Sequence, residues 1–218
     1  MGRATHEEID RVLRILVKEE GSLTMLGRMG VKYDAFKVLI STILSARAKD
    51  EVTEVLAEKL FELYDTAQKL ARAKQKDVIP IIRKIGFYNA KSRNIIETSK
   101  ILVEKYNGRV PDTLEQLTEL PGVGRKVANC VLVYAYKKDA IPVDTHVHRL
   151  SNRIGWVKTK TPEETERALE RILPKKHWQA INDALVTHGK TICAPVSPFC
   201  SKCPIFKYCK RNGVGRSR

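Results

Sequence analysis

The sequence predicts an all-α fold, and three observations support this prediction. Apolar residues recur every three or four positions along most of the 218 residues, which places them on one face of a helix. Capping residues precede several of these segments. No segment shows the clear alternation of apolar and polar residues, or the hairpin signals, that are typical of β-strands. We therefore expect about ten helices joined by short connections.

The first expected helix starts in the segment THEEIDRVLRILVKEE, residues 5–20. Thr5 and Glu8 have the spacing of a capping box, in which each side chain accepts a hydrogen bond from the other residue's backbone N–H. Thr161 precedes a proline and two glutamates, which predicts another helix start. The other helices are expected near residues 35–46, 50–64, 66–73, 78–85, 89–106 (closed by Gly108), 112–119, 124–136, from 145, and 177–190.

The charge of the chain is strongly unbalanced. It has 40 Lys and Arg residues against 25 Asp and Glu residues, a formal net charge of +15. A surface of this kind favours a polyanionic partner, and nucleic acid is the usual one. A heavily charged, thermophile-like surface is the alternative; it explains the many charges but leaves their imbalance unexplained.

The chain shows no targeting or membrane signal. No apolar run reaches the roughly 18 residues that a membrane helix needs, and the segment MGRATHEEID lacks the apolar core of a signal peptide. We expect a monomer without a membrane partner. Its expected location is the cytoplasm, in association with the nucleoid, if the organism is prokaryotic, and the nucleus if it is eukaryotic.

A glycine turn, LPGVGRK at residues 120–126, joins two expected helices. Gly122 and Gly124 permit positive φ and close approach of the backbone to another molecule. The second helix then offers backbone N–H groups and a positive dipole end to an anion. This arrangement is a helix-hairpin-helix, which binds the DNA backbone without reading bases. The alternative is an ordinary αα-hairpin with a glycine turn.

Lys126 and Asp144 are the candidate catalytic residues. Lys126 falls in the first turn of the helix after the glycines, where the positive helix end makes an amine lose its proton more readily. A neutral amine can form a Schiff base, whereas the alternative role is simple contact with phosphate. Asp144, in IPVDTHVHR, precedes a helix that begins at Thr145. It is either an N-cap alone or also a rigid carboxylate that supports developing positive charge on a sugar carbon.

Four of the five cysteines lie close together near the C-terminus: Cys193, Cys200, Cys203 and Cys209. In a reducing compartment, clustered cysteines are more often metal ligands than disulfides. Their spacing is compatible with two kinds of metal centre, zinc and an iron–sulfur cluster. Zinc usually binds two close pairs, and here only Cys200 and Cys203 form one, whereas an iron–sulfur cluster takes four thiolates from one wrapped loop. The fifth, Cys130, stands in the apolar segment ANCVLVY and is expected in the core.

The segments LPGVGRKVAN and VDTHVHRLSNR, together with the cysteine spacing, resemble the endonuclease III family of DNA base-excision glycosylases. The segments LISTILSARAKD and IGFYNAKSRNI extend the resemblance over nearly the whole chain. The resemblance implies a bifunctional glycosylase and AP lyase that acts on double-stranded DNA with oxidised pyrimidines, such as thymine glycol, or abasic sites. It also favours a [4Fe–4S] cluster over zinc at the four cysteines.

In that family the lysine that matches Lys126 attacks C1′ of the damaged nucleotide. The base leaves, an imine forms, and β-elimination cuts the strand 3′ to the lesion. The aspartate that matches Asp144 assists the nucleophile and stabilises the cationic sugar. These roles are what the resemblance implies for this chain.

The resemblance also implies residues that contact DNA. Arg47 stands where the family places a gap-filling polar residue, commonly glutamine, so arginine is a departure from the pattern. Phe87 stands at the family's apolar wedge, although a core aromatic is the alternative. His146 matches an active-site histidine of the family, with simple packing near Asp144 as the alternative. The other expected DNA contacts are Gly122, Gly124, Arg125, His146, Lys202 and Lys207.

By analogy with the family, we expect two helical lobes with a cleft between them. A six-helix lobe at residues 28–138 carries the helix-hairpin-helix, and residues 1–27 and 139–218 form the iron–sulfur cluster lobe. Two other functions stay open: a mismatch thymine or uracil glycosylase of the same superfamily, and a non-catalytic helix-hairpin-helix DNA-binding protein with a zinc-stabilised tail. An adenine-mismatch glycosylase is disfavoured because LISTILSARAKD lacks the glutamate that those enzymes carry there.

Overall fold

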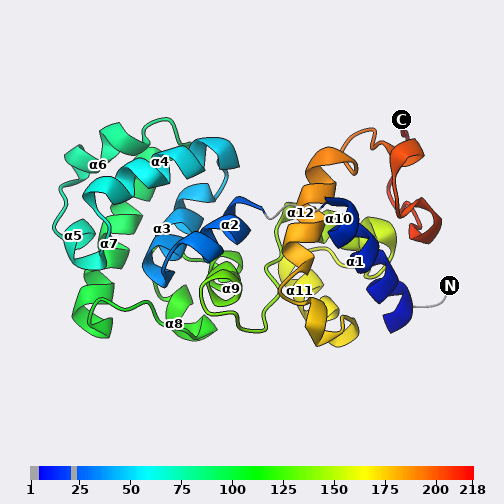
Figure 1. Ribbon diagram of the computed structural model, residues 1–218, viewed down its shortest axis with the longest axis horizontal. Helices are drawn as coiled ribbons and strands as arrows, with labels where there is room; N and C mark the ends of the chain where they lie inside the picture. The colour runs from blue at the N-terminus through cyan, green and yellow to red at the C-terminus, as the bar shows by residue number, and fades with distance from the viewer. Residues whose placement is uncertain (1–4, 21–23) are drawn as a thin grey trace. The chain divides into compact units, whose positions relative to one another are not determined.

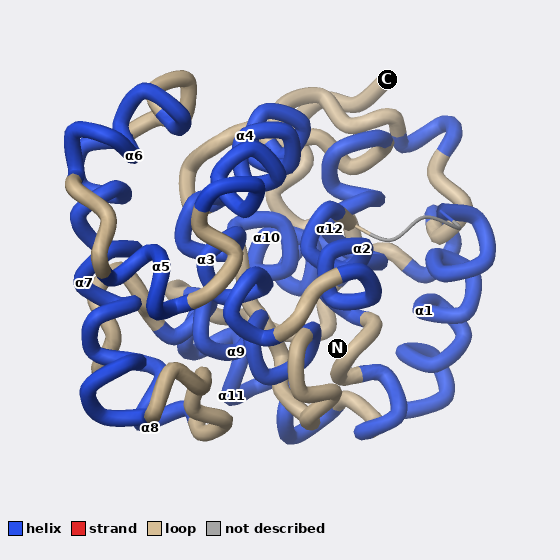
Figure 2. The backbone as a smooth tube through the Cα atoms, turned by 60° about the vertical axis from the view of Figure 1, so that its left-hand side comes forward, coloured by secondary structure: helices blue, strands red, loops and turns tan. Residues whose placement is uncertain are grey.

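The computed structural model describes residues 5–20 and 24–218, and all regular secondary structure in these ranges is helical (Figure 2). The prediction of an all-α protein is confirmed. The chain divides into two compact units, Met25–Lys138 and Met1–Thr24 with Asp139–Arg218. Residues 1–4 and 21–23, which belong to the expected segment 1–27, lie outside the described residues. None of the helices within the described ranges is long and apolar enough to cross a membrane.

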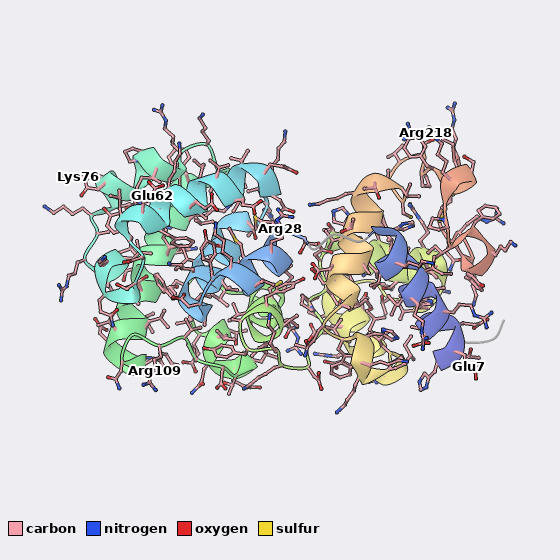
Figure 3. The ribbon with its side chains drawn as sticks, in the orientation of Figure 1. Glu7, Arg28, Glu62, Lys76, Arg109 and Arg218 are labelled. Atoms are coloured by element: carbon pink, nitrogen blue, oxygen red, sulfur yellow. The ribbon has the colours of Figure 1, made fainter. Side chains whose placement is uncertain are left out.

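The unit Met25–Lys138 is built around α3, which contacts four other helices of the unit. Nearly every side chain of α3 from Phe36 to Leu44 is buried, because the helix is apolar on all sides. Charged side chains such as those of Glu62, Lys76 and Arg109 point away from the helices into solvent (Figure 3). The helices of this unit are α2 (Met25–Lys32), α3 (Ala35–Ser45), α4 (Asp50–Leu63), α5 (Ala67–Ala71), α6 (Gln75–Ile82), α7 (Tyr88–Tyr106), α8 (Leu114–Thr118) and α9 (Arg125–Tyr134).

The other unit joins the first helix of the chain to its last third (Figure 1). Helix α12 contacts both α1 and α10. Fully buried residues such as Ile9, Leu150 and Leu185 form the core of this unit. The α-helices of this unit are α1 (His6–Glu20), α10 (Thr145–Ile154), α11 (Pro162–Ile172) and α12 (Ile181–Thr191). Three 3₁₀ turns follow α11 or α12: η1 (Lys175–His177), η2 (Cys200–Lys202) and η3 (Phe206–Tyr208).

The capping signals that predicted helix starts are present as hydrogen bonds. The Thr5 N–H donates to Glu8 Oε2 at 2.9 Å, and the Glu8 N–H donates to Thr5 Oγ1 at 3.2 Å. Thr161 caps α11 by accepting from the Glu164 N–H. Local hydrogen bonds of this kind depend on residues three positions apart, which is why the sequence predicts them well.

Helix α2 was not predicted. Its eight residues include two glycines, which lower intrinsic helix propensity. At Gly30 a Cβ atom would lie 2.7 Å from the carbonyl oxygen of Tyr134, so the glycine lets α2 approach α9 closely. Tertiary packing therefore forms a helix that local propensity does not favour. The end of α7 also differs in detail, because Asn107 adopts the left-handed conformation before Gly108 does.

Candidate functional site

The glycine turn between α8 and α9 has a fixed conformation. Gly122 has φ of +78°, in the region that favours glycine, and a Cβ atom there would lie 2.7 Å from Asn94 Nδ2. Behind the turn, the Thr98 hydroxyl donates to the carbonyl oxygen of Pro121 at 3.0 Å. Asn94 and Thr98 both belong to α7, so this helix holds the turn in place.

Gly124 serves a different purpose from Gly122. It is the N-cap residue of α9, with φ of −86°, a conformation open to most residues. A Cβ atom at Gly124 would meet no protein atom within 4 Å, so this position faces open space. The conformational freedom of glycine is therefore not required at Gly124, and the position leaves space beside the start of α9.

Arg125 and Lys126 form the first turn of α9, and both are half-buried. From Val127 to Tyr134 every side chain of α9 is buried. This packing fixes the helix axis, so the position of the Lys126 backbone is set by the core. Cys130, expected in the core, is fully buried in this helix.

Arg47 and Phe87 lie together at the surface of the same unit. The guanidinium carbon of Arg47 lies 6.0 Å from the centroid of the Phe87 ring. Phe87 is 64% exposed, so the alternative that it is a core aromatic is wrong. Both residues have positive φ, 54° for Arg47 and 61° for Phe87. Non-glycine residues in this region carry backbone strain, which is concentrated at functional sites.

In the other unit, Asp144 caps α10. Its Oδ1 atom accepts hydrogen bonds from the backbone N–H groups of His146 at 2.8 Å and Val147 at 2.9 Å. The prediction that Asp144 is an N-cap is confirmed. Two backbone donors and the positive helix end hold this half-buried carboxylate in one orientation.

His146 and Arg149 lie beside this carboxylate on α10. Burial lowers the pKa of His146, and the Asp144 carboxylate opposes that change. Arg149 Nη2 lies 3.3 Å from His146 Nδ1 and donates to the carbonyl oxygens of Gly189 and Cys193. At Gly189 a Cβ atom would lie 2.6 Å from His146 Nδ1, so this glycine makes room for the imidazole.

The four C-terminal cysteines line one pocket of this unit. Apolar residues such as Leu150, Ile154 and Ile205 share the lining. None of the four forms a disulfide. Among the described residues, no three His, Cys, Asp or Glu side chains converge as ligands of one metal ion.

Donors surround the sulfur atoms. Arg153, only 7% exposed, donates from Nη1 to Cys193 Sγ at 3.3 Å, and the Arg211 N–H donates to Cys209 Sγ at 3.4 Å. Cys203 Sγ lies 3.6 Å from Nε2 of the fully buried His188. Burial raises the pKa of the Cys203 thiol to about 11, and the neighbouring cysteines add to this.

Lys202 and Lys207 are exposed on η2 and η3, between the cysteines. The structure thus groups some predicted residues: Arg47 with Phe87, Asp144 with His146, and the four cysteines around one pocket. Four residues near these groups were not predicted: Lys91, Arg149, Arg153 and His188. The two arginines are four positions apart, which is the only sequence signal of a shared helix face.

Comparisons with known proteins identify the family. Residues 40–175 match the model of the HhH-GPD superfamily base excision DNA repair protein. Endonuclease III of Thermotoga maritima is 54% identical over 188 residues, which cover 85% of this chain and 88% of that relative.

Solved structures agree with this match. The structure of a trapped endonuclease III–DNA covalent intermediate superimposes with a TM-score of 0.86 at 34% identity, covering 95% of this chain and 97% of that one. A thermostable thymine-DNA glycosylase shares the fold, with a TM-score of 0.81 at 23% identity over 94% and 96% of the two chains. The chain therefore belongs to the HhH-GPD superfamily of base excision DNA repair proteins and, within it, to the endonuclease III family.

Proposed function

We propose that this protein is a base-excision-repair DNA glycosylase with AP lyase activity. It removes oxidised pyrimidines from double-stranded DNA and cuts the strand 3′ to the abasic site. Membership of the endonuclease III family supports the reaction class. The observation that carries the proposal is Lys126, which directly follows the glycine turn at the start of α9. An amine at this point separates a lyase from a glycosylase that uses water alone.

The reaction follows from a lysine nucleophile. The Nζ atom of neutral Lys126 attacks C1′, the N-glycosidic bond breaks, and the base leaves with the electron pair and takes up a proton. The C1′–O4′ bond then breaks, O4′ takes up a proton that Nζ has lost, and the opened sugar carries an imine between Nζ and C1′. Loss of a proton from C2′ then expels the 3′-phosphate by β-elimination, which cuts the strand.

Asp144 supports the first step electrostatically. C1′ gains positive charge as the base departs, and a fixed carboxylate stabilises such charge more than mobile water does. The two backbone N–H donors at Oδ1 support this role because they hold the carboxylate in one orientation. His146 is proposed to act beside it through a contact with DNA.

The glycine turn binds the DNA backbone. Gly122 sets the shape of the turn, and Gly124 leaves room for a phosphate group beside the N-terminus of α9. Arg125 adds a positive charge at the same place. These contacts position the strand without reading its sequence.

Arg47 and Phe87 take part in extruding the damaged nucleotide. Extrusion costs a few kcal/mol, and side chains that fill the resulting gap offset part of that cost. The exposure of Phe87 and its position beside Arg47 support this role. At position 47 the family commonly has glutamine. Arg47 instead brings a positive charge to the side chains that are proposed to face the opposite strand.

The four C-terminal cysteines are proposed to hold a [4Fe–4S] cluster. Four thiols that line one pocket fit such a group, because a cubane binds one thiolate at each of four irons. The four side chains would hold the group as thiolates. Burial raises the pKa of the Cys203 and Cys209 thiols, so these two would release their protons on binding it. When bound, the cluster would cross-link the loop.

The lobe assignment belongs to the same proposal. Residues 28–138 are the helix-hairpin-helix lobe, and residues 1–27 with 139–218 are the cluster lobe. Lys202 and Lys207 contact DNA from the cysteine loop, which their exposure supports. The protein acts as a monomer in the compartment that holds the genome.

The alternative functions are not favoured. The thymine-DNA glycosylase shares the fold at only 23% identity, which carries no substrate assignment. A non-catalytic DNA-binding protein does not require a lysine at position 126.

A duplex with one thymine glycol tests the proposal. We expect base release together with a strand break that leaves a 3′ unsaturated aldehyde and a 5′-phosphate, resolved by denaturing electrophoresis. Release of the base with an intact strand would contradict the lyase assignment. A matched duplex with a T:G mismatch tests the first alternative, and faster excision there would favour a mismatch glycosylase.

A further inference from the structure

Lys91 is a buried lysine at the start of α7. Lys91 is 5% exposed, and lysine is among the residues least often found inside proteins. Burial alone lowers the pKa of Lys91 to about 8, so the fold disfavours its charge. A position of this kind implies a specific contact that an apolar residue would not make.

The contact is with the end of α3. Lys91 Nζ donates a hydrogen bond of 2.8 Å to the carbonyl oxygen of Leu44. The last four carbonyls of a helix lack partners within the helix. Near this end, the Ser45 hydroxyl binds the Thr42 carbonyl oxygen, and the Ala48 N–H binds the Ser45 carbonyl oxygen. Lys91 therefore caps the Leu44 carbonyl, one of the two that lie between them.

Lys91 links the backbone segments that carry Arg47 and Phe87, one through its side chain and the other through its backbone. Its side chain fixes Leu44, three residues before Arg47. Its backbone N–H donates to the carbonyl oxygen of Phe87 at 3.0 Å. The two loops also approach each other at Gly86, where a Cβ atom would lie 3.6 Å from the Arg47 carbonyl oxygen. One residue thus ties together the segments that carry both left-handed, exposed residues.

We propose that Lys91 is a positioning residue for nucleotide extrusion, because it fixes the end of α3 against the start of α7 and so holds Arg47 and Phe87 as one unit. This inference rests on the proposed function. Both residues are strained, and strained residues persist only where the surrounding structure over-determines them. The Lys91–Leu44 hydrogen bond provides that constraint from inside the protein.

The test compares Lys91→Met with wild type. Methionine keeps the length and the apolar stem but removes the donor. We expect the single-turnover excision of thymine glycol from a duplex to fall about tenfold, which corresponds to about 1.4 kcal/mol. The fluorescence of 2-aminopurine opposite the lesion reports extrusion directly, and its rise is expected to slow by a similar factor.

A control on the same helix separates positioning from stability. Ser99→Ala removes the buried hydrogen bond from the Ser99 hydroxyl to the Ile95 carbonyl oxygen, farther along α7. We expect this variant to keep excision within about twofold of wild type, since it lies away from both loops. If Lys91→Met fails to fold, Lys91→Gln carries the same test, because its shorter side chain keeps a donor group but removes the span to Leu44.

A double-mutant cycle decides the mechanism. Lys91 acts through Arg47 and Phe87, so Lys91→Met is expected to add less than twofold loss in a background that carries Arg47→Ala and Phe87→Ala. A further tenfold loss in that background would overturn the proposal, as would wild-type excision by Lys91→Met alone. If the wild-type protein neither excises thymine glycol nor cuts an abasic site, the proposed function itself fails, which is a distinct result.

Discussion

The glycine turn and the cysteine loop are supported in different ways. The turn is fixed by protein atoms: α7 binds it through Thr98, and α9 is buried from Val127 to Tyr134. The cysteine loop, residues 193–209, has short 3₁₀ turns, and its buried Cys193 and half-buried Cys200, Cys203 and Cys209 line one pocket. The first region is held by the core, whereas the second is proposed to need a bound cluster. Loss of the proposed cluster is therefore expected to disorder the cysteine loop and to leave the glycine turn intact.

Loss of a cluster ligand is the largest expected effect. Cys203→Ser should remove the stoichiometric iron and brown colour that the proposed cluster predicts, and with them the protease resistance of residues 193–218, because binding of a structural centre and folding of its loop are coupled. Iron analysis and limited proteolysis measure this.

Cys130→Ala is the matched control for that change. Cys130 is also a cysteine, but it is fully buried in α9. The variant should keep its iron and lose about 1 kcal/mol of stability from the lost core packing. Equal iron loss in both variants would contradict the assignment of the four ligands.

Asp144→Asn separates the cap from the chemistry. Asparagine caps helices about as well as aspartate, so the melting temperature should change by no more than a few degrees. Turnover should fall at least ~100-fold because the fixed negative charge is gone. Thermal melts and single-turnover assays on the same preparation measure both. A loss of DNA affinity that equals the loss of rate would instead indicate a structural role.

The two glycines of the turn should respond differently to alanine. Gly122→Ala places a Cβ atom in a left-handed conformation and against Asn94, so we expect about 1–3 kcal/mol of destabilisation. Gly124→Ala meets no protein atom, and its stability should stay within about 0.5 kcal/mol of wild type while DNA affinity falls. Urea unfolding and DNA titration distinguish the two. Equal destabilisation would show that Gly124 also has a structural role.

The last expected effect is confined to alkaline solution: it is the pH dependence that Lys91 adds to stability. Its pKa is about 8 in the folded protein and about 10.4 in the unfolded chain. Between these values the unfolded chain binds more protons, so the free energy of unfolding rises with pH, by at most roughly 1 kcal/mol per unit.

The difference in unfolding free energy between wild type and Lys91→Met isolates this contribution. The difference should be nearly constant below about pH 7 and should grow in favour of wild type toward pH 10. A flat difference across the whole range would show that Lys91 keeps its charge in the folded state.

Local patterns account for what the sequence predicted well. The helix caps formed by Thr5 with Glu8, by Thr161 and by Asp144 are hydrogen bonds between residues at most three positions apart. Such caps can be predicted from the sequence without knowledge of the fold. The glycine turn and the cysteine spacing are equally local. The left-handed conformation of Arg47 and Phe87 has no such signal, because it is imposed by packing between α3 and α7.

The burial of Lys91 could not be predicted for the same reason. In YNAKSRN it stands among polar residues and resembles a solvent-exposed lysine. Its partner, the Leu44 carbonyl oxygen, is a backbone atom distant in sequence, and any residue carries one. Helix α2 shows the reverse case, where long-range packing at Gly30 overrides weak local propensity.

Borohydride trapping tests the central claim, that Lys126 is the nucleophile. Wild-type protein mixed with an abasic-site duplex and sodium borohydride should give a covalent protein–DNA adduct, and peptide mapping should locate it at Lys126. Lys126→Gln should bind the same duplex with similar affinity and give no adduct. Full trapping by Lys126→Gln, or an adduct at another lysine in wild type, would contradict the account.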